Sequence, residues 1–167
     1  APYHIREILG QGGMGTVYLA EQQEPLHRLV ALKVLRSGAP SAEVLARFES
    51  ERQALARLSH PHIAQVFAAG TTDDGLPYLV MEYVPGEPIT RYCAQRQLDT
   101  RERLTLFADI CRAVHHCHLR GLIHRDVKPS NVLITEFDGA ACPKVIDFGV
   151  AKAIEPRVGT HSTRHGQ

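Results

Sequence analysis

The first half of the chain consists of short apolar runs separated by turn residues. This pattern predicts strands over residues 3–9, 16–21, 29–35, 63–69 and 76–84. The first three follow one another closely, so we expect an antiparallel meander. An apolar spacing of three and four residues predicts a helix from Ser41, a residue type favoured at N-caps, to about Leu58. The first half is therefore predicted to be a sheet with one helix.

From Pro85 onward the pattern changes to that of helices. One long helix is predicted to stop at Gly121, since glycine commonly ends helices. Five residues at helical spacing are expected to form its buried stripe: Leu104, Phe107, Cys111, Val114 and His118. The change at Pro85 predicts two lobes, a strand-rich one over 1–84 and a helical one over 85–167.

The region after Gly121 contains two short apolar pieces, at 132–134 and 144–146, on either side of a turn at 138–139. The last stretch, 155–167, has no periodicity and is rich in Thr, Ser, Arg, His and Gly. We expect that stretch to be mobile.

Composition describes an ordinary globular unit, with 44% hydrophobic and 22% charged residues. A net charge of +1 gives no electrostatic reason to expect nucleic-acid or membrane-surface binding. No apolar run approaches the roughly 20 residues that cross a bilayer, so no membrane span is expected in this chain. The four cysteines have no CxxC spacing and no apolar leader precedes them, which favours a reducing, cytoplasmic setting.

A glycine cluster follows the first predicted strand. Gly10, Gly12 and Gly15 fit the pattern GxGxxG, in which missing side chains allow backbone N–H groups to approach phosphate oxygens. The dinucleotide-binding version of this pattern requires a helix afterwards, whereas a second strand is predicted here. By itself the cluster could also be a glycine-rich hairpin that binds nothing, which is the less favoured alternative.

Lys33 lies inside an apolar strand, on the same face as Ala31. A solvated lysine at a sheet edge is the simple alternative. The following helix argues against it, because Glu51 falls within that helix's apolar stripe. An unpaired buried carboxylate is costly, so an inward-pointing Lys33 is the expected partner of Glu51.

Two further motifs complete a set, His124–Asn131 with the pattern HRDxKxxN and Asp147–Gly149 with the pattern DFG. With the glycine cluster and Lys33, these motifs occur in the order of the eukaryotic-type protein kinase family, which the chain resembles from Tyr3 to about Lys152. Lys128, two residues after Asp126, is similar to serine/threonine kinases. The first loop is similar to the bacterial branch of the family.

The resemblance implies an α+β, protein-kinase-like two-lobe fold and ATP with Mg²⁺ as cofactors. Lys33 would hold the α- and β-phosphates, braced by Glu51. Asn131 and Asp147 would ligate Mg²⁺ through oxygen. Asp126 would orient the substrate hydroxyl and accept its proton, while Lys128 would neutralise the γ-phosphate.

The resemblance also implies an adenine slot. Val17 and Ala31 would cover one face of the ring, Leu133 the other, and Met81 would guard the back. The backbone of Glu82 to Val84 would pair with the ring edge, and Glu87 would reach the ribose. For the apolar positions, ordinary core packing is the alternative.

Three alternatives stay open. A pseudokinase or nucleotide-binding scaffold would usually have lost a catalytic Lys, Asp or Asn, and all are present here. Arg125 resembles the arginine of kinases switched by phosphorylation, with Thr160, Ser162 and Thr163 as nearby acceptors, but a flexible Ser/Thr-rich tail fits equally. The ligand-type side chains of the long helix could form a metal site, although no second element supplies partners: Cys111, His115, His116, Cys117 and His118.

The family pattern continues after the DFG motif through an activation segment and further helices, which are not in this sequence. We therefore expect a complete strand-rich lobe, a partial helical lobe, and little kinase activity from residues 1–167 alone. Serine or threonine on a protein is the expected acceptor, and the sequence does not name the substrate.

Overall fold

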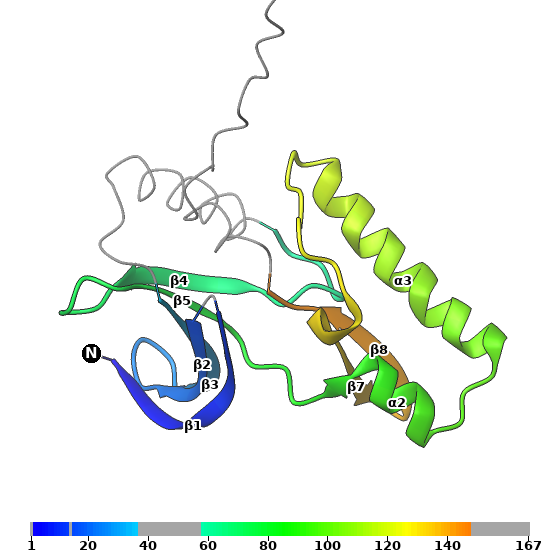
Figure 1. The fold of residues 1–167 in the computed structure, drawn as a ribbon, viewed down its shortest axis with the longest axis horizontal. Helices are drawn as coiled ribbons and strands as arrows, with labels where there is room; N and C mark the ends of the chain where they lie inside the picture. The colour runs from blue at the N-terminus through cyan, green and yellow to red at the C-terminus, as the bar shows by residue number, and fades with distance from the viewer. Residues whose placement is uncertain (1, 14, 37–57, 148–167) are drawn as a thin grey trace, which may run out of the picture.

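A computed structural model describes residues 2–13, 15–36 and 58–147. The elements, in chain order, are the following: β1 (Tyr3–Gly12), β2 (Gly15–Gln22), β3 (Arg28–Leu35), β4 (Val66–Thr71), β5 (Pro77–Glu82), β6 (Glu87–Pro88), α2 (Ile89–Gln95), α3 (Thr100–His118), the 3₁₀ turn η1 (Pro129–Asn131), β7 (Val132–Phe137) and β8 (Ala140–Val145). In Figure 1 the strands β1 to β5 lie on one side, and α2, α3, β7 and β8 on the other. The helix expected over 41–58 falls almost wholly outside the described residues, and Glu51 with it.

Strands β1 to β5 form one antiparallel sheet in the order β1-β2-β3-β5-β4, which confirms the predicted meander. The predicted strand over 63–69 was wrong at its start, because β4 begins at Val66. Ile63 instead forms a parallel bridge with Val145. The Ala64 N–H donates to the Val145 carbonyl (2.9 Å), so Ala64 is bonded to β8, and Gln65 is the first residue of this segment to bond β5.

The two faces of β3 pack into different clusters. Val30 and Leu32 belong to a small cluster with Ala20 and Val80 on one face. Ala31 and Leu35 face the main core, which continues through Val66, Leu79 and Met81 into the helical part of the molecule. Lys33 lies between Ala31 and Leu35 on that same face and is only 4% exposed. The alternation of the sequence therefore predicted its orientation correctly.

Helix α3 starts at a capping box, in which the Asp99 side chain accepts from the Glu102 N–H. The predicted buried stripe was wrong except at Val114, which is half-buried and packs against the core. Leu104 is 60% and Phe107 is 59% exposed, and Cys111 is also exposed. The residues that enter the core are Leu106, Ile110, Ala113 and Cys117. Both stripes have helical spacing, so only contact with the rest of the fold selects between them.

Glycine ends α3 as expected. Gly121 has φ +73°, and the Leu122 N–H returns to the Cys117 carbonyl (3.0 Å). Strands β7 and β8 form the hairpin predicted around 138–139, with Asp138 (φ 49°) and Gly139 (φ 78°) at its two-residue turn. No helix in the described ranges is long and apolar enough to cross a membrane.

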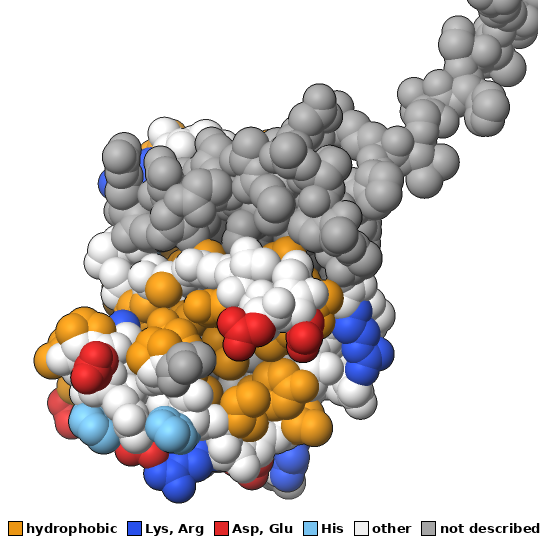
Figure 2. Space-filling view, turned by 90° about the vertical axis from the view of Figure 1, so that its left-hand side faces the viewer, with side chains coloured by type: hydrophobic (Ala, Val, Ile, Leu, Met, Phe, Trp, Pro, Cys, Tyr) orange, Lys and Arg blue, Asp and Glu red, His pale blue; other side chains and the backbone are white. Residues whose placement is uncertain are grey.

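The outer end of the five-stranded sheet carries exposed apolar side chains. Ile5, Ile8, Leu26 and Leu29 are each about half exposed or more. Figure 2 shows hydrophobic side chains gathered on this face of the molecule, among charged ones. Ile5 and Ile8 belong to β1, which is an edge strand of the sheet.

Candidate active site

The loop between α3 and β7 positions Asp126. Asn131 is buried, and its Nδ2 donates both to the Asp126 carbonyl (2.8 Å) and to Oδ2 of its carboxylate (3.0 Å). The Lys128 Nζ lies 3.0 Å from the same Oδ2. The turn η1 holds this arrangement, with Pro129 at its start and the Asn131 N–H donating to the Lys128 carbonyl (2.9 Å). The three predicted residues Asp126, Lys128 and Asn131 thus form one hydrogen-bonded group.

His124 is only 1% exposed and fixes the Asp126 loop to the rest of the fold through hydrogen bonds. Its Nδ1 accepts from the Asp126 N–H (3.3 Å), so its Nε2–H donates to the Ile146 carbonyl (3.0 Å). The Ile146 N–H in turn donates to the Asn131 carbonyl (2.9 Å). The imidazole therefore joins the Asp126 loop to the residue before Asp147. Sequence reasoning included His124 in the motif but gave it no role.

Burial lowers the pKa of His124 below its usual 6.5, and this outweighs the hydrogen bond to Ile146 and the nearby carboxylates. The unfolded chain binds a proton here near pH 6.5, whereas the folded chain binds it only at lower pH. We therefore expect the contribution of this histidine to the free energy of unfolding to be fully present above about pH 6.5. The contribution should be lost as the pH falls below that value.

NMR titration of the His124 ring, compared with the urea-unfolded chain, measures this difference. A midpoint in the folded chain equal to or above that of the unfolded chain would contradict the expected direction.

Lys33 makes its described contact with Asp147. The Lys33 Nζ forms an ion pair with the Asp147 Oδ1, and the lysine side chain is 5% exposed. Sequence reasoning paired Lys33 with Glu51, which lies outside the described residues, so that pairing stays a prediction. The contact across 114 positions brings the phosphate-binding candidate of the sheet to the metal-binding candidate after β8.

Two site residues have left-handed backbones, Arg125 (φ 62°) and Asp147 (φ 58°). Such a conformation costs roughly 1–2 kcal/mol per non-glycine residue, and it persists where surrounding contacts hold it. Here the contacts are the His124 and Asn131 bonds around Ile146, together with the Lys33 ion pair at Asp147. Backbone strain thus coincides with the residues predicted to carry chemistry.

The glycines of the β1–β2 turn fall into two groups. A Cβ added at Gly10 or Gly12 would meet no atom within 4 Å. At Gly15 (φ +149°) it would collide with the Val34 carbonyl oxygen. Packing therefore requires glycine at 15 but leaves open space over 10 and 12, where a ligand could approach the backbone.

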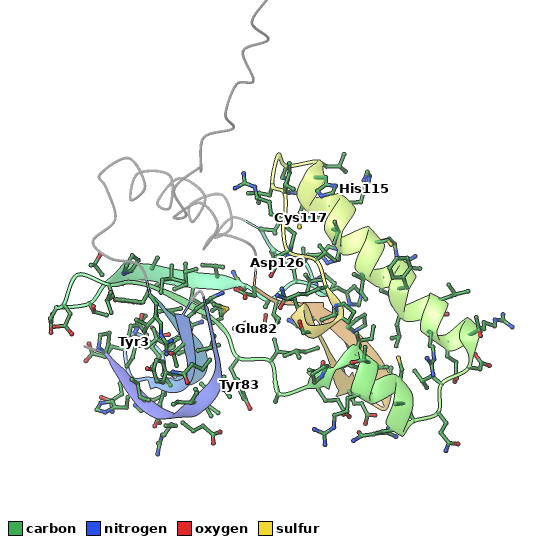
Figure 3. All side chains as sticks on the ribbon, viewed as in Figure 1. Tyr3, Glu82, Tyr83, His115, Cys117 and Asp126 are labelled. Atoms are coloured by element: carbon green, nitrogen blue, oxygen red, sulfur yellow. The ribbon has the colours of Figure 1, made fainter. Side chains whose placement is uncertain are left out.

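The predicted adenine-slot residues lie partly together. Val17 pairs with Lys33, Ala31 pairs with Met81, and all of them face the main core side of the sheet. Leu133 is half-buried between the buried Val132 and Ile134, so it points away from their core. Figure 3 places Glu82 and Asp126 in the middle of the molecule, between the sheet and α3.

Comparison with known proteins agrees with this geometry. The family described as "Protein kinase domain" matches residues 3–166. The chain belongs to the protein kinase family.

Relatives of this kinase chain are found in bacteria. It is 41% identical over 157 residues to the serine/threonine-protein kinase PknB of Mycolicibacterium smegmatis, covering 91% of this chain and 24% of the relative. It is 40% identical to the serine/threonine-protein kinase PrkC of Bacillus subtilis, covering 96% of this chain and 24% of the relative. The chain thus spans about a quarter of these relatives' length.

Among solved structures, the PknI kinase domain of Mycobacterium tuberculosis superposes with a TM-score of 0.75 at 38% identity. The match covers 90% of this chain and 60% of the PknI chain. The resemblance to the bacterial serine/threonine branch, inferred from the sequence, is confirmed.

Lys144 is a neighbour of this kinase site that sequence reasoning missed. Its Nζ lies 2.5 Å from the Glu82 Oε1, while the Glu82 Oε2 accepts from the Gln65 N–H (3.2 Å). Glu82 was predicted for its backbone alone. Its carboxylate joins the end of β5 to β8, which leads to Asp147. No local pattern marks this pair, because its members are 62 positions apart.

Two further suggestions from the sequence concern a ribose contact of Glu87 and a metal site on α3. The Glu87 carboxylate is 3.4 Å from Arg91 of α2, and the expected contact with a ribose stays a prediction. On α3, the Cys117 thiol donates to the Ala113 carbonyl (3.3 Å), and burial raises its pKa to about 11. Metal binding needs a thiolate, and the described residues contain no group of three potential metal ligands. The helix cluster therefore supports no metal site.

Proposed function

We propose that this kinase chain takes part in transferring the γ-phosphoryl group of ATP to serine or threonine hydroxyls of a protein substrate. Two observations together carry the proposal: the ion pair of the buried Lys33 with the half-buried Asp147, and the bonded Asp126–Asn131 group, which the Ile146 N–H connects to the residue before Asp147. They bring together a cation, two oxygen ligands and a general-base candidate from three separate segments. Phosphoryl transfer depends mainly on such positioning and charge neutralisation.

In the proposed nucleotide site, the backbone N–H groups around Gly10, Gly12 and Gly15 would approach the phosphates. Lys33 would hold the α- and β-phosphates, with Glu51 as its further partner. Adenine would lie between Val17 with Ala31 and Leu133, in front of Met81. The Glu82 N–H and the Val84 carbonyl already bond Gln65 and Gly86, so the Glu82 carbonyl and the Val84 N–H are the groups proposed for the ring edge.

Asn131 and Asp147 suit Mg²⁺ by the chemistry of their donor atoms. The amide nitrogen of Asn131 is engaged by Asp126, which turns its oxygen to the opposite side. Mg²⁺ prefers such oxygen ligands, and when bound it would neutralise phosphate charge. The bond from the Ile146 N–H to the Asn131 carbonyl keeps the two residues on adjoining backbone.

Asp126 would accept the proton of the substrate hydroxyl as that oxygen attacks the γ-phosphorus, while the bond from this phosphorus to the β,γ-bridging oxygen breaks and ADP leaves. Asn131 fixes one carboxylate oxygen, so the carboxylate is oriented before substrate arrives. Lys128, 3.0 Å from the same oxygen, would carry positive charge toward the transferred phosphoryl group. Because ATP is the phosphoryl donor, we place this part of the protein in the cytoplasm.

Lys33→Met tests the nucleotide site. We expect calorimetric titration of the chain with Mg·ATP to show binding that this substitution weakens roughly 10- to 100-fold, since charge-assisted hydrogen bonds contribute about 1.5–3 kcal/mol. Arg6→Met is the control, because Arg6 is an exposed cation paired with Glu21 on the outer sheet. Equal affinities of the Lys33→Met variant and wild type would contradict the assignment, and absence of any binding would contradict the site.

A nucleotide-binding scaffold without transferase activity is the second candidate. It would share the affinity for Mg·ATP but transfer no phosphate, so an assay of the intact protein that carries this chain separates the two. Lys33, Asp126, Asn131 and Asp147 are all present. Asp126 and Asn131 are bonded in one group with Lys128, and Lys33 is paired with Asp147, which favours the enzyme.

A further inference from the structure

Three imidazole rings connect the segment before β4 to the second half of α3. The rings of His60 and His62 have centroids 5.6 Å apart, and His60 lies 4.8 Å from His116 of α3. Arg120 continues the row, with its Nη1 3.1 Å from the His116 Nδ1. In Figure 1 this segment runs from the grey trace to β4, beside the yellow chain that follows α3.

Hydrogen bonds fix the protonation of two of these rings. The His60 Nδ1 accepts from the His62 N–H (3.1 Å), and the His116 Nδ1 accepts from Arg120, because a guanidinium can only donate. Each ring therefore carries its hydrogen on Nε2 and is neutral. The His116 Nε2 is buried and has no hydrogen-bond partner among the described residues.

A second proton on His60 could bind only at Nδ1. It would remove the acceptor that now holds the His62 N–H, and it would place a cation beside the His116 ring. Burial, His116, His62 and Arg120 all lower the pKa of His60. The present geometry thus requires a neutral acceptor on His60, and acid removes it.

The surrounding groups provide little negative charge to stabilise a protonated His60. Asp109 of α3 is the one carboxylate described at this junction, and it pairs with Arg112 and faces His62 (3.9 Å from Nε2) rather than His60. On β8, the Cys142 Sγ lies 3.7 Å from the His62 Nδ1, which donates to the Pro143 carbonyl (2.8 Å). His62 therefore has an anion in reach, whereas His60 and His116 face Arg120.

We propose that His60, packed against His116 and near Arg120, is an acid-sensitive latch, which holds the segment around residues 60–64 against α3 while His60 is neutral and releases it when His60 is protonated. Release of this segment would affect the proposed nucleotide site through the contacts of His62 with β8. Its carbonyl accepts from the Val145 N–H (2.9 Å), and its ring bonds Pro143, both on the strand that leads to Asp147. Acidification would therefore weaken nucleotide binding, a consequence that rests on the proposed nucleotide site.

The latch is tested with the double variant His60→Asn/His116→Asn. The asparagine Oδ1 replaces Nδ1 as an acceptor but does not titrate in this range. We expect the free energy of unfolding, measured with denaturant between pH 7.5 and 5.5, to fall less steeply in the variant than in wild type. His124 is present in both proteins, so its contribution cancels in the comparison. The control is His115→Asn/His118→Asn, which removes two exposed histidines of the same helix and should keep the wild-type slope.

Titration of wild type by NMR gives a second measurement that needs no variant. The His60 ring should titrate at a lower pH in the folded chain than in the urea-unfolded chain. Equal slopes of the double variant and wild type, or a His60 midpoint that does not fall on folding, would overturn the latch.

Mg·ATP titrations at pH 7.5 and 5.8 test the consequence for the site. Wild type should lose about two- to tenfold more affinity than the double variant, since one pKa unit corresponds to tenfold. Equal losses would overturn the connection to the site. Absence of binding at both pH values would instead reject the nucleotide site, while the unfolding and NMR measurements would still decide on the latch.

Discussion

Asp126→Asn is expected to lower the turnover of the intact kinase by about 10²–10⁴ while leaving its affinity for ATP nearly unchanged. The substitution keeps the size of the side chain but removes the group that would accept the hydroxyl proton. The carboxylate is bonded to Asn131 and Lys128, which are not among the predicted adenine-slot residues, so we expect the adenine contacts to be kept. Steady-state phosphorylation of a generic protein substrate gives kcat and the KM for ATP.

Asp138→Asn is the matched control for this experiment. It makes the same chemical change at the β7–β8 turn, where φ is 49° and asparagine is readily accepted. That variant should retain wild-type turnover. If Asp126→Asn also retained it, Asp126 would not be the base and the scaffold would become the better account of the chain.

Gly15→Ala is expected to destabilise the fold by roughly 2–5 kcal/mol, because overpacking and a strained backbone each cost about 1–3 kcal/mol. A Cβ at this position collides with the Val34 carbonyl oxygen, and φ +149° disfavours an L side chain. The clash involves backbone on β3, next to Lys33, so a rotamer change cannot relieve it. Denaturant unfolding of wild type and variant measures the difference.

Gly12→Ala separates folding from ligand binding at the same turn. Open space surrounds the Cβ position of Gly12. The loss in free energy of unfolding should therefore be much smaller for Gly12→Ala than for Gly15→Ala. Its affinity for Mg·ATP should nevertheless fall, since the methyl group would occupy space proposed for the phosphates. A Gly12→Ala protein as unstable as Gly15→Ala would show that packing, rather than ligand approach, requires this glycine.

Residues close in sequence were the ones whose arrangement could be predicted. The meander of β1 to β3, the hairpin at 138–139 and the helix end at Gly121 follow from alternation, turn residues and glycine conformation, all local effects. The inward orientation of Lys33 follows from the same alternation. The motifs identified the chemistry, because phosphate, metal and proton transfer each need particular side chains at short spacing.

Contacts between distant segments could not be predicted in this way. Helix α3 has apolar residues on two faces, and packing against the core selected Leu106 and Ile110 rather than Leu104 and Phe107. Ile63 forms a parallel bridge with Val145 of β8 instead of starting β4, and this pairing joins residues 82 positions apart.

The sequence by itself determined the meander of the first three strands, the turns and the residue types of the site. The tertiary structure alone decided that β5 lies between β3 and β4, that Lys33 meets Asp147, that His124 bonds Ile146, and that the His60 ring packs against the His116 ring. The physical reason is that periodicity records only which side of an element is apolar. Which partner that side meets is settled when all elements bury their surfaces together.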